Sequence, residues 1–372
     1  MKTNIVIAVL VVFGLAMHIQ VFRERPATAI CGTDFPIFYG SAKLLGTPDL
    51  YSPAAVQRMQ RQEIGCGSAA AAFIRLPYFA ALIWPFTVLP VGAAFAIWRV
   101  LLIAAELGFV AFFREHWKWA LLACVWSWPL AWDLDNGQDA SFLLLALMAG
   151  AFLLSRGRPF AAGLCFSWCA AKPHLVILLP LLLIAQNLRR TAAGLAAGGA
   201  ICIAISFAVA GWSWPPRFLH AISNPAIDPT PMELHNIRGM VHGWLPAEIA
   251  LGLTVAIAVW IVCRRAPFEI GLAAVLAGSL LVCHHLTASD WCMLLPVGLI
   301  VGFRAPTAAV RAAAITLITP LVVLFQNRPG LMRIPDYLLV GLVYAMALEA
   351  WRMRNSSVVK HNLTPEPSGS IL

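Results

Sequence analysis

Long apolar runs alternate with polar connections along almost the entire chain. A helix of about 20 apolar residues spans the hydrocarbon core of a bilayer, so this pattern predicts an all-α polytopic membrane protein. The thirteen runs cover residues 5–22, 73–90, 91–113, 119–134, 140–154, 160–171, 174–186, 191–210, 246–263, 268–286, 290–303, 306–325 and 335–351.

The composition agrees with a membrane location. Of the 372 residues, 60% are hydrophobic and 12% are charged, and the mean hydropathy is +0.80. A soluble protein carries about 25% charged residues. These values exclude a soluble globular enzyme, a disordered protein and a nucleic-acid binder. The net charge of +9 is typical of a membrane protein whose cytoplasmic loops collect Lys and Arg.

Basic residues recur on every second connection and predict the orientation of the chain. Because cytoplasmic loops carry an excess of Lys and Arg, these connections are expected to face the cytoplasm. The long polar connections 23–72 and 211–245 are then outer loops. The basic connections are 155–158, 187–190, 263–265, 303–311 and 351–354.

One apolar run must fail to cross if this orientation holds. The run 119–134 is short, contains Pro129 and leads into a polar segment, so it is the predicted re-entrant or broken helix. About twelve full spans follow, with both termini in the cytoplasm. This scheme places Arg114 and Lys118 on the outer side.

The chain is predicted to form a single transmembrane domain over residues 1–351. The first run could be a signal peptide, but the charged segment 23–26 separates it from the possible cleavage site at 27–29, so an uncleaved span is favoured. Residues 352–372 are polar and contain Pro and Ser, which predicts a disordered cytoplasmic tail.

The nine cysteines contain no CxxC pair and therefore show no zinc pattern. Seven of them lie in apolar runs and are expected to be small core residues. Cys31 and Cys66 lie in the first outer loop, where they could form a disulfide; two free thiols are the alternative.

Asp34 is the first candidate for chemistry. Phe35, Phe38 and Tyr39 follow it at helical spacing, which predicts a short helix at the membrane interface. Asp34 would then lie at the boundary between water and lipid, where partial desolvation makes a carboxylate more basic. The alternative is an Asp that only caps the helix.

Residues 34–51 resemble the opening of glycosyltransferase family 87. They read Asp-Phe-x-x-Phe-Tyr, then Ala-x-Leu-Leu, then Pro-x-Leu-Tyr. The resemblance continues in order over roughly residues 30–300. Residues 77–90 are similar to a Tyr-Pro-Pro stretch of the family, although the order here is Leu-Pro-Tyr. Further similar elements are Asn136-Gly137-Gln138, Lys172-Pro173-His174 and His285 to Asp290 followed by Leu294-Leu295-Pro296.

The resemblance implies a GT-C-like helical bundle whose extracytoplasmic first loop carries interfacial helices. Members of the family are mannosyltransferase-like and use polyprenyl-phosphate sugars. By resemblance, the chain transfers a hexose, with mannose expected, from such a donor to an extracytoplasmic lipid or glycan acceptor, and inverts the anomeric carbon. The implied location is the inner (plasma) membrane of a bacterial-type cell, with the active site on the extracytoplasmic face.

By the same resemblance, Asp34 is the general base that takes the proton of the acceptor hydroxyl. Lys172 is the expected partner of the lipid phosphate, because a lysine between apolar helices is costly unless it is paired or lines a wet cavity; snorkelling to the interface is the alternative. The remaining expected substrate-binding residues are Tyr39, Arg75, Asn136, Gln138, His174, His285 and Asp290.

Several of these residues have a structural alternative. Arg75 could anchor the chain at the interface, Asn136 and Gln138 could cap helices, and His285 could be a packed core histidine. No metal or other cofactor is expected, since a polyprenyl-phosphate donor has no diphosphate to clamp. The rival functions are a transporter or lipid-sugar flippase, and a structural subunit of a polysaccharide assembly.

Overall fold

The computed structural model describes residues 2–24, 30, 32–65, 72–224, 230–326, 328 and 330–357. All regular secondary structure in this part of the chain is helical, as predicted. The α-helices are α1 (Lys2–Glu24), α2 (Phe35–Lys43), α3 (Pro53–Ile64), α4 (Pro77–Ile83), α5 (Val91–Ala111), α6 (Trp117–Val125), α7 (Trp128–Asn136), α8 (Ala140–Ser155), α9 (Pro159–Phe166), α10 (Leu179–Ala185), α11 (Arg189–Ala210), α12 (Trp214–Ile222), α13 (Ile237–Met240), α14 (Leu245–Arg265), α15 (Phe268–Val282), α16 (Leu294–Arg304), α17 (Ala308–Thr316), α18 (Leu321–Gln326) and α19 (Ile334–Ser357). The 3₁₀ helices are η2 (Pro48–Tyr51), η3 (Trp84–Val88), η4 (Ser167–Ala171), η5 (Pro173–Val176), η6 (Pro231–Glu233) and η7 (Ala288–Met293).

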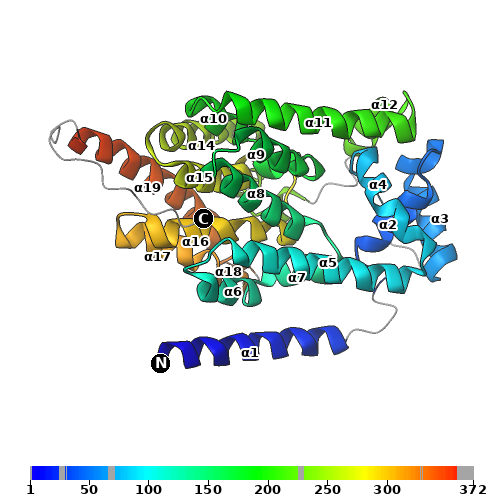
Figure 1. Ribbon diagram of the computed structural model, residues 1–372, viewed down its shortest axis with the longest axis horizontal. Helices are drawn as coiled ribbons and strands as arrows, with labels where there is room; N and C mark the ends of the chain where they lie inside the picture. The colour runs from blue at the N-terminus through cyan, green and yellow to red at the C-terminus, as the bar shows by residue number, and fades with distance from the viewer. Residues whose placement is uncertain are drawn as a thin grey trace.

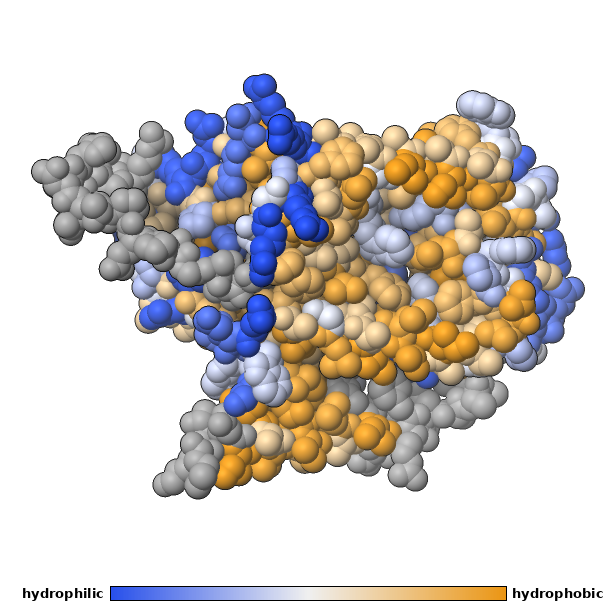
Figure 2. Space-filling model, viewed as in Figure 1, coloured by the Kyte–Doolittle hydropathy of each residue, from blue (hydrophilic) through white to orange (hydrophobic). Residues whose placement is uncertain are grey.

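Four helices of the described chain, α5, α11, α14 and α19, are long and apolar enough to cross a bilayer. The pair α7 and α8, bent by 118°, makes a fifth if it is counted as one span. Breaks divide the other apolar runs into shorter helices, so the number of about twelve spans stays a prediction. Figure 2 shows a broad apolar belt between polar ends, as expected for a protein surrounded by lipid.

The basic connections lie at one end of the helices and the first polar loop lies at the other. Helix α11 begins at Arg189 and is about 33 Å long at 1.5 Å per residue. Near its far end, the hydroxyl of Ser206 accepts a hydrogen bond from the backbone N–H of Tyr78 in α4 (3.1 Å). Figure 1 shows α2, α3, α4 and α12 grouped at that end of the molecule. We call it the loop end, and the opposite one the basic end.

The chain reverses direction between α9 and α10. Helix α9 runs parallel to α11, and Gly163 and Gly194 leave no room for side chains where the two helices meet; such small residues allow close packing. After Lys172 the chain returns through η5 and α10 to the basic end. There Gln186 donates to the carbonyls of Cys263 and Ala266, both at 3.2 Å. Similar reversals separate α7 from α8 and α15 from α16.

The end of α5 does not lie on the side that the sequence predicted for Arg114 and Lys118. The end of α5 lies at the basic end, because the ring of Phe112 lies 5.6 Å from that of Phe152 and the ring of His116 stacks on Phe303 (3.9 Å between centroids). Arg114 and Lys118 therefore lie with the other basic connections rather than on the outer side. Helices α6 and α7, which contain most of the run 119–134, lead back to the loop end.

The run that stays at the loop end is 73–90. It forms α4 and η3, seven and five residues long, which are too short to span. Pro85 and Pro90 interrupt the helical pattern. The hydroxyl of Tyr39 in α2 donates to the carbonyl of Leu89 (2.8 Å) and holds the segment in place.

The sequence suggested that α2 exposes its aromatic face to the membrane interface. In the structure this face is turned into the protein. All residues from Phe35 to Ala42 are buried. Phe35 stacks on Phe95 of α5 (4.9 Å, 7° between planes), and Phe38 meets Phe79 of α4 edge-on (5.1 Å). The aromatic spacing therefore serves packing inside the protein.

Helix α1 lies at the edge of the molecule (Figure 1), where it packs against α6. Trp126 donates through Nε1 to the carbonyl of Leu10 (3.1 Å). Cys31 and Cys66 lie outside the described residues, and so does their proposed disulfide. Helix α19 continues to Ser357, beyond the predicted start of the tail at Arg352, and residues 358–372 are also outside the described part.

We expect residue 115 to face the same side of the membrane as residue 156, and residue 47 to face the other side. The test uses single cysteines at these positions in a chain whose native cysteines are replaced, and labels intact vesicles with an impermeant thiol reagent. Labelling of positions 115 and 47 from the same side would contradict the placement of α5.

Candidate active site

A cavity of about 320 Å³ opens where the three chain reversals meet the first polar loop. Seven of the nine residues predicted from the sequence to act in catalysis or substrate binding line it, although they come from distant parts of the chain. They are Asp34, Arg75, Gln138, Lys172, His174, His285 and Asp290. Polar residues that interrupt apolar runs are therefore gathered at one place, as expected for a functional site.

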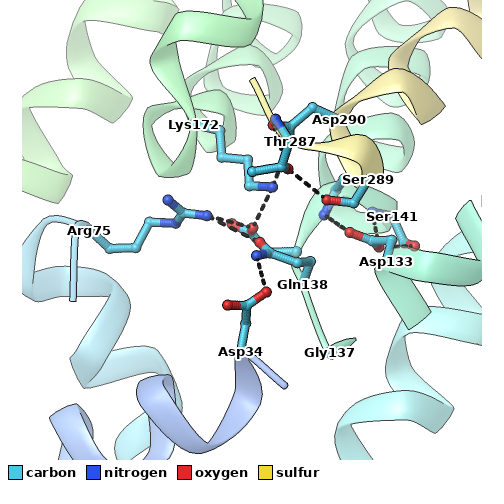
Figure 3. A network of polar contacts seen from close by, with 12 residues as sticks. Asp34, Arg75, Asp133, Gly137, Gln138, Ser141, Lys172, Thr287, Ser289 and Asp290 are labelled. Atoms are coloured by element: carbon cyan, nitrogen blue, oxygen red, sulfur yellow. Dashed lines mark hydrogen bonds and ion pairs between the residues drawn. The ribbon is translucent and has the colours of Figure 1, made fainter. Parts of the chain in front are cut away.

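Asp34 occupies the N-cap position of α2, but its side chain makes no capping hydrogen bond. Its Oδ2 instead accepts a hydrogen bond from Nε2 of Gln138 (2.6 Å), and its backbone N–H donates to the carbonyl of Asn136 (3.0 Å). Figure 3 shows the carboxylate pointing from α2 toward Gln138. The interpretation of Asp34 as a simple helix cap is therefore wrong.

Burial raises the pKa of the Asp34 carboxyl above its ordinary value of 3.8. The hydrogen bond from Gln138 and the charges of Lys172 and Arg75 act in the opposite direction, but the loss of hydration is the larger effect. The Oδ1 atom has no hydrogen bond within the described chain. Asp34 thus combines raised basicity with a free oxygen, which are the two properties of a general base.

The turn 136–139 positions Gln138 and requires a glycine. Gly137 has φ of +68°, in the region that favours glycine, and a Cβ there would clash with Phe95 and Phe35. Its carbonyl accepts a hydrogen bond from Nε1 of Trp98 (2.9 Å). This contact anchors the turn on α5 directly behind Asp34.

Two neighbouring carboxylates at the start of α8 have different roles. Asp133 accepts hydrogen bonds from the backbone N–H groups of Ala140 and Ser141, both at 3.1 Å, and so caps the helix. Asp139 occupies the N-cap position but makes no capping bond. Its carboxylate is therefore available for the cations of the cavity.

Arg75 is 6% exposed and reaches two partners of this turn with one nitrogen. Its Nη2 donates to Oδ1 of Asp139 (3.2 Å) and to Oε1 of Gln138 (3.3 Å). Its Nε is buried without a hydrogen-bond partner in the described chain. Gln138 therefore connects Arg75 to Asp34, and Arg75 is an internal residue of the site rather than an interfacial anchor.

Lys172 lies at the reversal between η4 and η5 and is 2% exposed, so it does not snorkel to the surface. Its Nζ donates to Oδ1 of Asp290 (2.7 Å) and lies 3.6 Å from Oδ1 of Asp139. Asp290 in turn accepts at Oδ2 from the backbone N–H and the hydroxyl of Thr287, both at 2.8 Å. Both oxygens of Asp290 are thus occupied, and this residue orients Lys172 (Figure 3).

The two histidines lie together on the cavity wall. The ring centroids of His174 and His285 are 6.2 Å apart at 84°, and Nε2 of His174 is buried without a hydrogen-bond partner in the described chain. Trp132 and Asn224 also line the cavity. The sequence did not single out these two, because neither belongs to a recognisable motif.

Two predicted binding residues do not line the cavity. The hydroxyl of Tyr39 donates to the carbonyl of Leu89, and the side chain of Asn136 donates to the carbonyl of Trp132 (2.9 Å). Both support the fold behind the site. Asp139, by contrast, is central to the network. The sequence marks it as a polar residue at the mouth of an apolar run, where it could bind a sugar hydroxyl, but does not predict its ion pairs with Arg75 and Lys172.

The arrangement suits a reaction in which a proton is removed and negative charge develops nearby. Two buried cations, Arg75 and Lys172, are paired with the carboxylates of Asp139 and Asp290. They line the same cavity as the carboxylate of Asp34. In a buried site such charges act strongly on a developing anion. Among the described residues, no group of three His, Cys, Asp or Glu side chains is arranged to hold a metal ion.

We expect Lys172→Met and Asp290→Asn to destabilise the protein by about 3–5 kcal/mol each, because each change leaves a buried charge without its nearest partner. The double variant should lose less than the sum, since it removes both charges. Unfolding in detergent measures the three values. The partly exposed surface pair of Lys43 and Glu63 is the control, where Glu63→Gln should change stability by at most about 1 kcal/mol. Additive losses at Lys172 and Asp290 would show that the pair is not coupled.

Comparison with known proteins gives one match. The family model of glycosyltransferase family 87 matches residues 73–296, more than half of the chain. No curated protein and no solved structure shows significant similarity. The matched range includes every cavity residue named above except Asp34.

Proposed function

The chain belongs to glycosyltransferase family 87 and is therefore a membrane glycosyltransferase, and from this premise we propose that Asp34 is its general base. The donor in this proposal is a polyprenyl-phosphate hexose, with mannose as the hexose. The acceptor is a hydroxyl of a lipid or glycan on the extracytoplasmic face of the plasma membrane.

The position of the Asp34 carboxylate is the observation that carries the proposal. It lies on the wall of the cavity, is held at one oxygen by Gln138 at 2.6 Å, and keeps the other oxygen free. A residue that served only to start α2 would direct its carboxylate at the N–H groups of that helix. Asp34 does not do so.

The reaction is a single displacement. The acceptor oxygen attacks the anomeric carbon of the donor, and its proton passes to Oδ1 of Asp34. The bond between the anomeric carbon and the phosphate oxygen breaks, and its electron pair leaves with the polyprenyl phosphate. One displacement inverts the configuration at the anomeric carbon, which is the outcome that the family resemblance implies.

Arg75 and Lys172 are suited to stabilise the departing phosphate. Each is already paired with a carboxylate, Arg75 with Asp139 and Lys172 with Asp290. A guanidinium has five N–H donors and an ammonium three, so both retain donors for a ligand. His174 and His285 add imidazole nitrogens on the same wall.

The distribution of basic residues supports an extracytoplasmic site. The cavity lies at the loop end, and the Arg-rich connections lie at the opposite ends of α8, α11, α14 and α16. Since basic connections face the cytoplasm, the cavity faces outward in this proposal. The acceptor and the donor sugar then meet outside the cell, while the lipid tail of the donor stays in the bilayer.

Asp34→Asn should lower kcat by about 10²–10⁴-fold, because asparagine cannot accept the proton. The substrate KM values should change little. The assay follows transfer of labelled mannose from polyprenyl-phosphate mannose by the purified protein. Asp49→Asn removes an exposed carboxylate of the same loop and should retain activity. Full activity of the Asp34→Asn variant, or movement of the lipid across vesicles without any transfer, would refute the assignment.

The rate should fall at acidic pH as Asp34 becomes protonated. Burial raises the pKa of this carboxyl above 3.8, so kcat/KM should decline at higher pH than an exposed aspartate would produce. In Gln138→Met the hydrogen bond that lowers this pKa is lost, and the acid limb should move to still higher pH. A limb that stays in place or moves to lower pH would exclude Asp34 as the titrating group.

A further inference from the structure

A second cavity of about 330 Å³ adjoins the active-site cavity. The two share Trp132 and Thr287 as lining residues. Its volume is at the lower end of the usual range of small-molecule sites, about 300–1,000 Å³. We call it the tryptophan cavity; its lining residues include Trp128, Trp132, Glu233, His235, Trp291 and Gln326.

The lining combines flat aromatic surfaces with a few polar groups. Trp128 and Trp132 lie one helical turn apart on α7, with ring centroids 6.4 Å apart and 34° between planes. Indole rings offer an apolar face for the C–H groups of a sugar ring. The carboxylate of Glu233 and the amide of Gln326 are suited to bind hydroxyl groups.

His235 is held in place from two sides. Its Nδ1 lies 3.2 Å from Oδ1 of Asp336 in α19, and Asp336 is also bound by Arg333 at 3.0 Å. Its ring meets that of Trp291 edge-on, with the centroids 6.0 Å apart. A wall fixed in this way is formed before a ligand arrives, which favours binding.

Two side chains of the lining carry unused donors. Nε1 of Trp291 and Nε2 of Gln326 are buried and have no hydrogen-bond partner within the described chain. Buried donors normally have a partner. A polyhydroxylated ligand could supply acceptors to both.

The charges of the two cavities point to different ligands. The active-site cavity contains Arg75 and Lys172, whereas the described lining of the tryptophan cavity contains Glu233 and no Lys or Arg. A phosphate would therefore be repelled from the tryptophan cavity. An uncharged saccharide would not be repelled.

We propose that the tryptophan cavity binds the neutral saccharide of the acceptor and directs its hydroxyl past Trp132 toward Asp34. This inference rests on the proposed transfer reaction. It makes the acceptor a glycan or glycolipid rather than a simple lipid alcohol. Trp132 and Thr287 form the boundary between the two sites, and Thr287 also holds Asp290, the partner of Lys172.

The test uses the purified full-length protein with labelled polyprenyl-phosphate mannose. Membranes from cells that lack the gene are titrated in as the source of acceptor. In Trp128→Ala and Glu233→Gln the apparent KM for the acceptor membranes should rise about tenfold or more, the size expected for loss of one good contact. The donor KM should stay unchanged. Trp117→Ala is the control, because Trp117 and Trp128 are similarly exposed (47% and 42%) and Trp117 lies at the basic end.

The possible outcomes separate the two proposals. Absence of transfer by the wild type would reject the proposed reaction itself. Transfer by the wild type, with acceptor KM values of both variants equal to that of Trp117→Ala, would reject the acceptor site alone. A rise in donor KM instead would assign the tryptophan cavity to the donor lipid. Glu233→Gln keeps the test valid if Trp128→Ala does not fold, since Glu233 is exposed on a short 3₁₀ helix.

Discussion

Four buried charges of alternating sign organise the cavity. Arg75, Asp139, Lys172 and Asp290 follow one another at distances of 3.2, 3.6 and 2.7 Å. A single charge buried at this depth would be very unfavourable, whereas each of these has an opposite charge beside it. The four residues come from four segments, so their pairing also determines how the turns of the bundle meet.

The backbone around the cavity is irregular because buried polar groups must be brought together there. Apolar helices end at Gly137, at Lys172 and before Thr287, and each end leaves peptide groups without helical partners. These groups are satisfied locally, by Asp133 at the start of α8 and by Asp290 at Thr287. Such breaks are tolerated at membrane depth where they line a cavity. The helices thus end where polar groups line the cavity and continue where their side chains contact only lipid.

The sequence predicted the fold class and most of the cavity, because polar residues in an apolar chain stand out. Lys172 and Asp290 could be identified in this way although they are 118 positions apart. It did not predict that Phe35 stacks on Phe95, since an aromatic face looks the same toward lipid as toward protein. The return of α6 and α7 to the loop end was also missed, because two short helices separated by a break resemble a re-entrant loop. Tyrosine and asparagine side chains bind sugars in many proteins. The side chains of Tyr39 and Asn136 instead donate hydrogen bonds to backbone carbonyls.

The burial of the four-charge chain has a consequence for the conditions under which the protein can work. Mobile ions weaken electrostatic contacts between exposed groups over about 8–10 Å at moderate ionic strength, but they reach enclosed pairs poorly. Arg75 and Lys172 are 6% and 2% exposed. The arrangement should therefore persist from dilute to concentrated saline media.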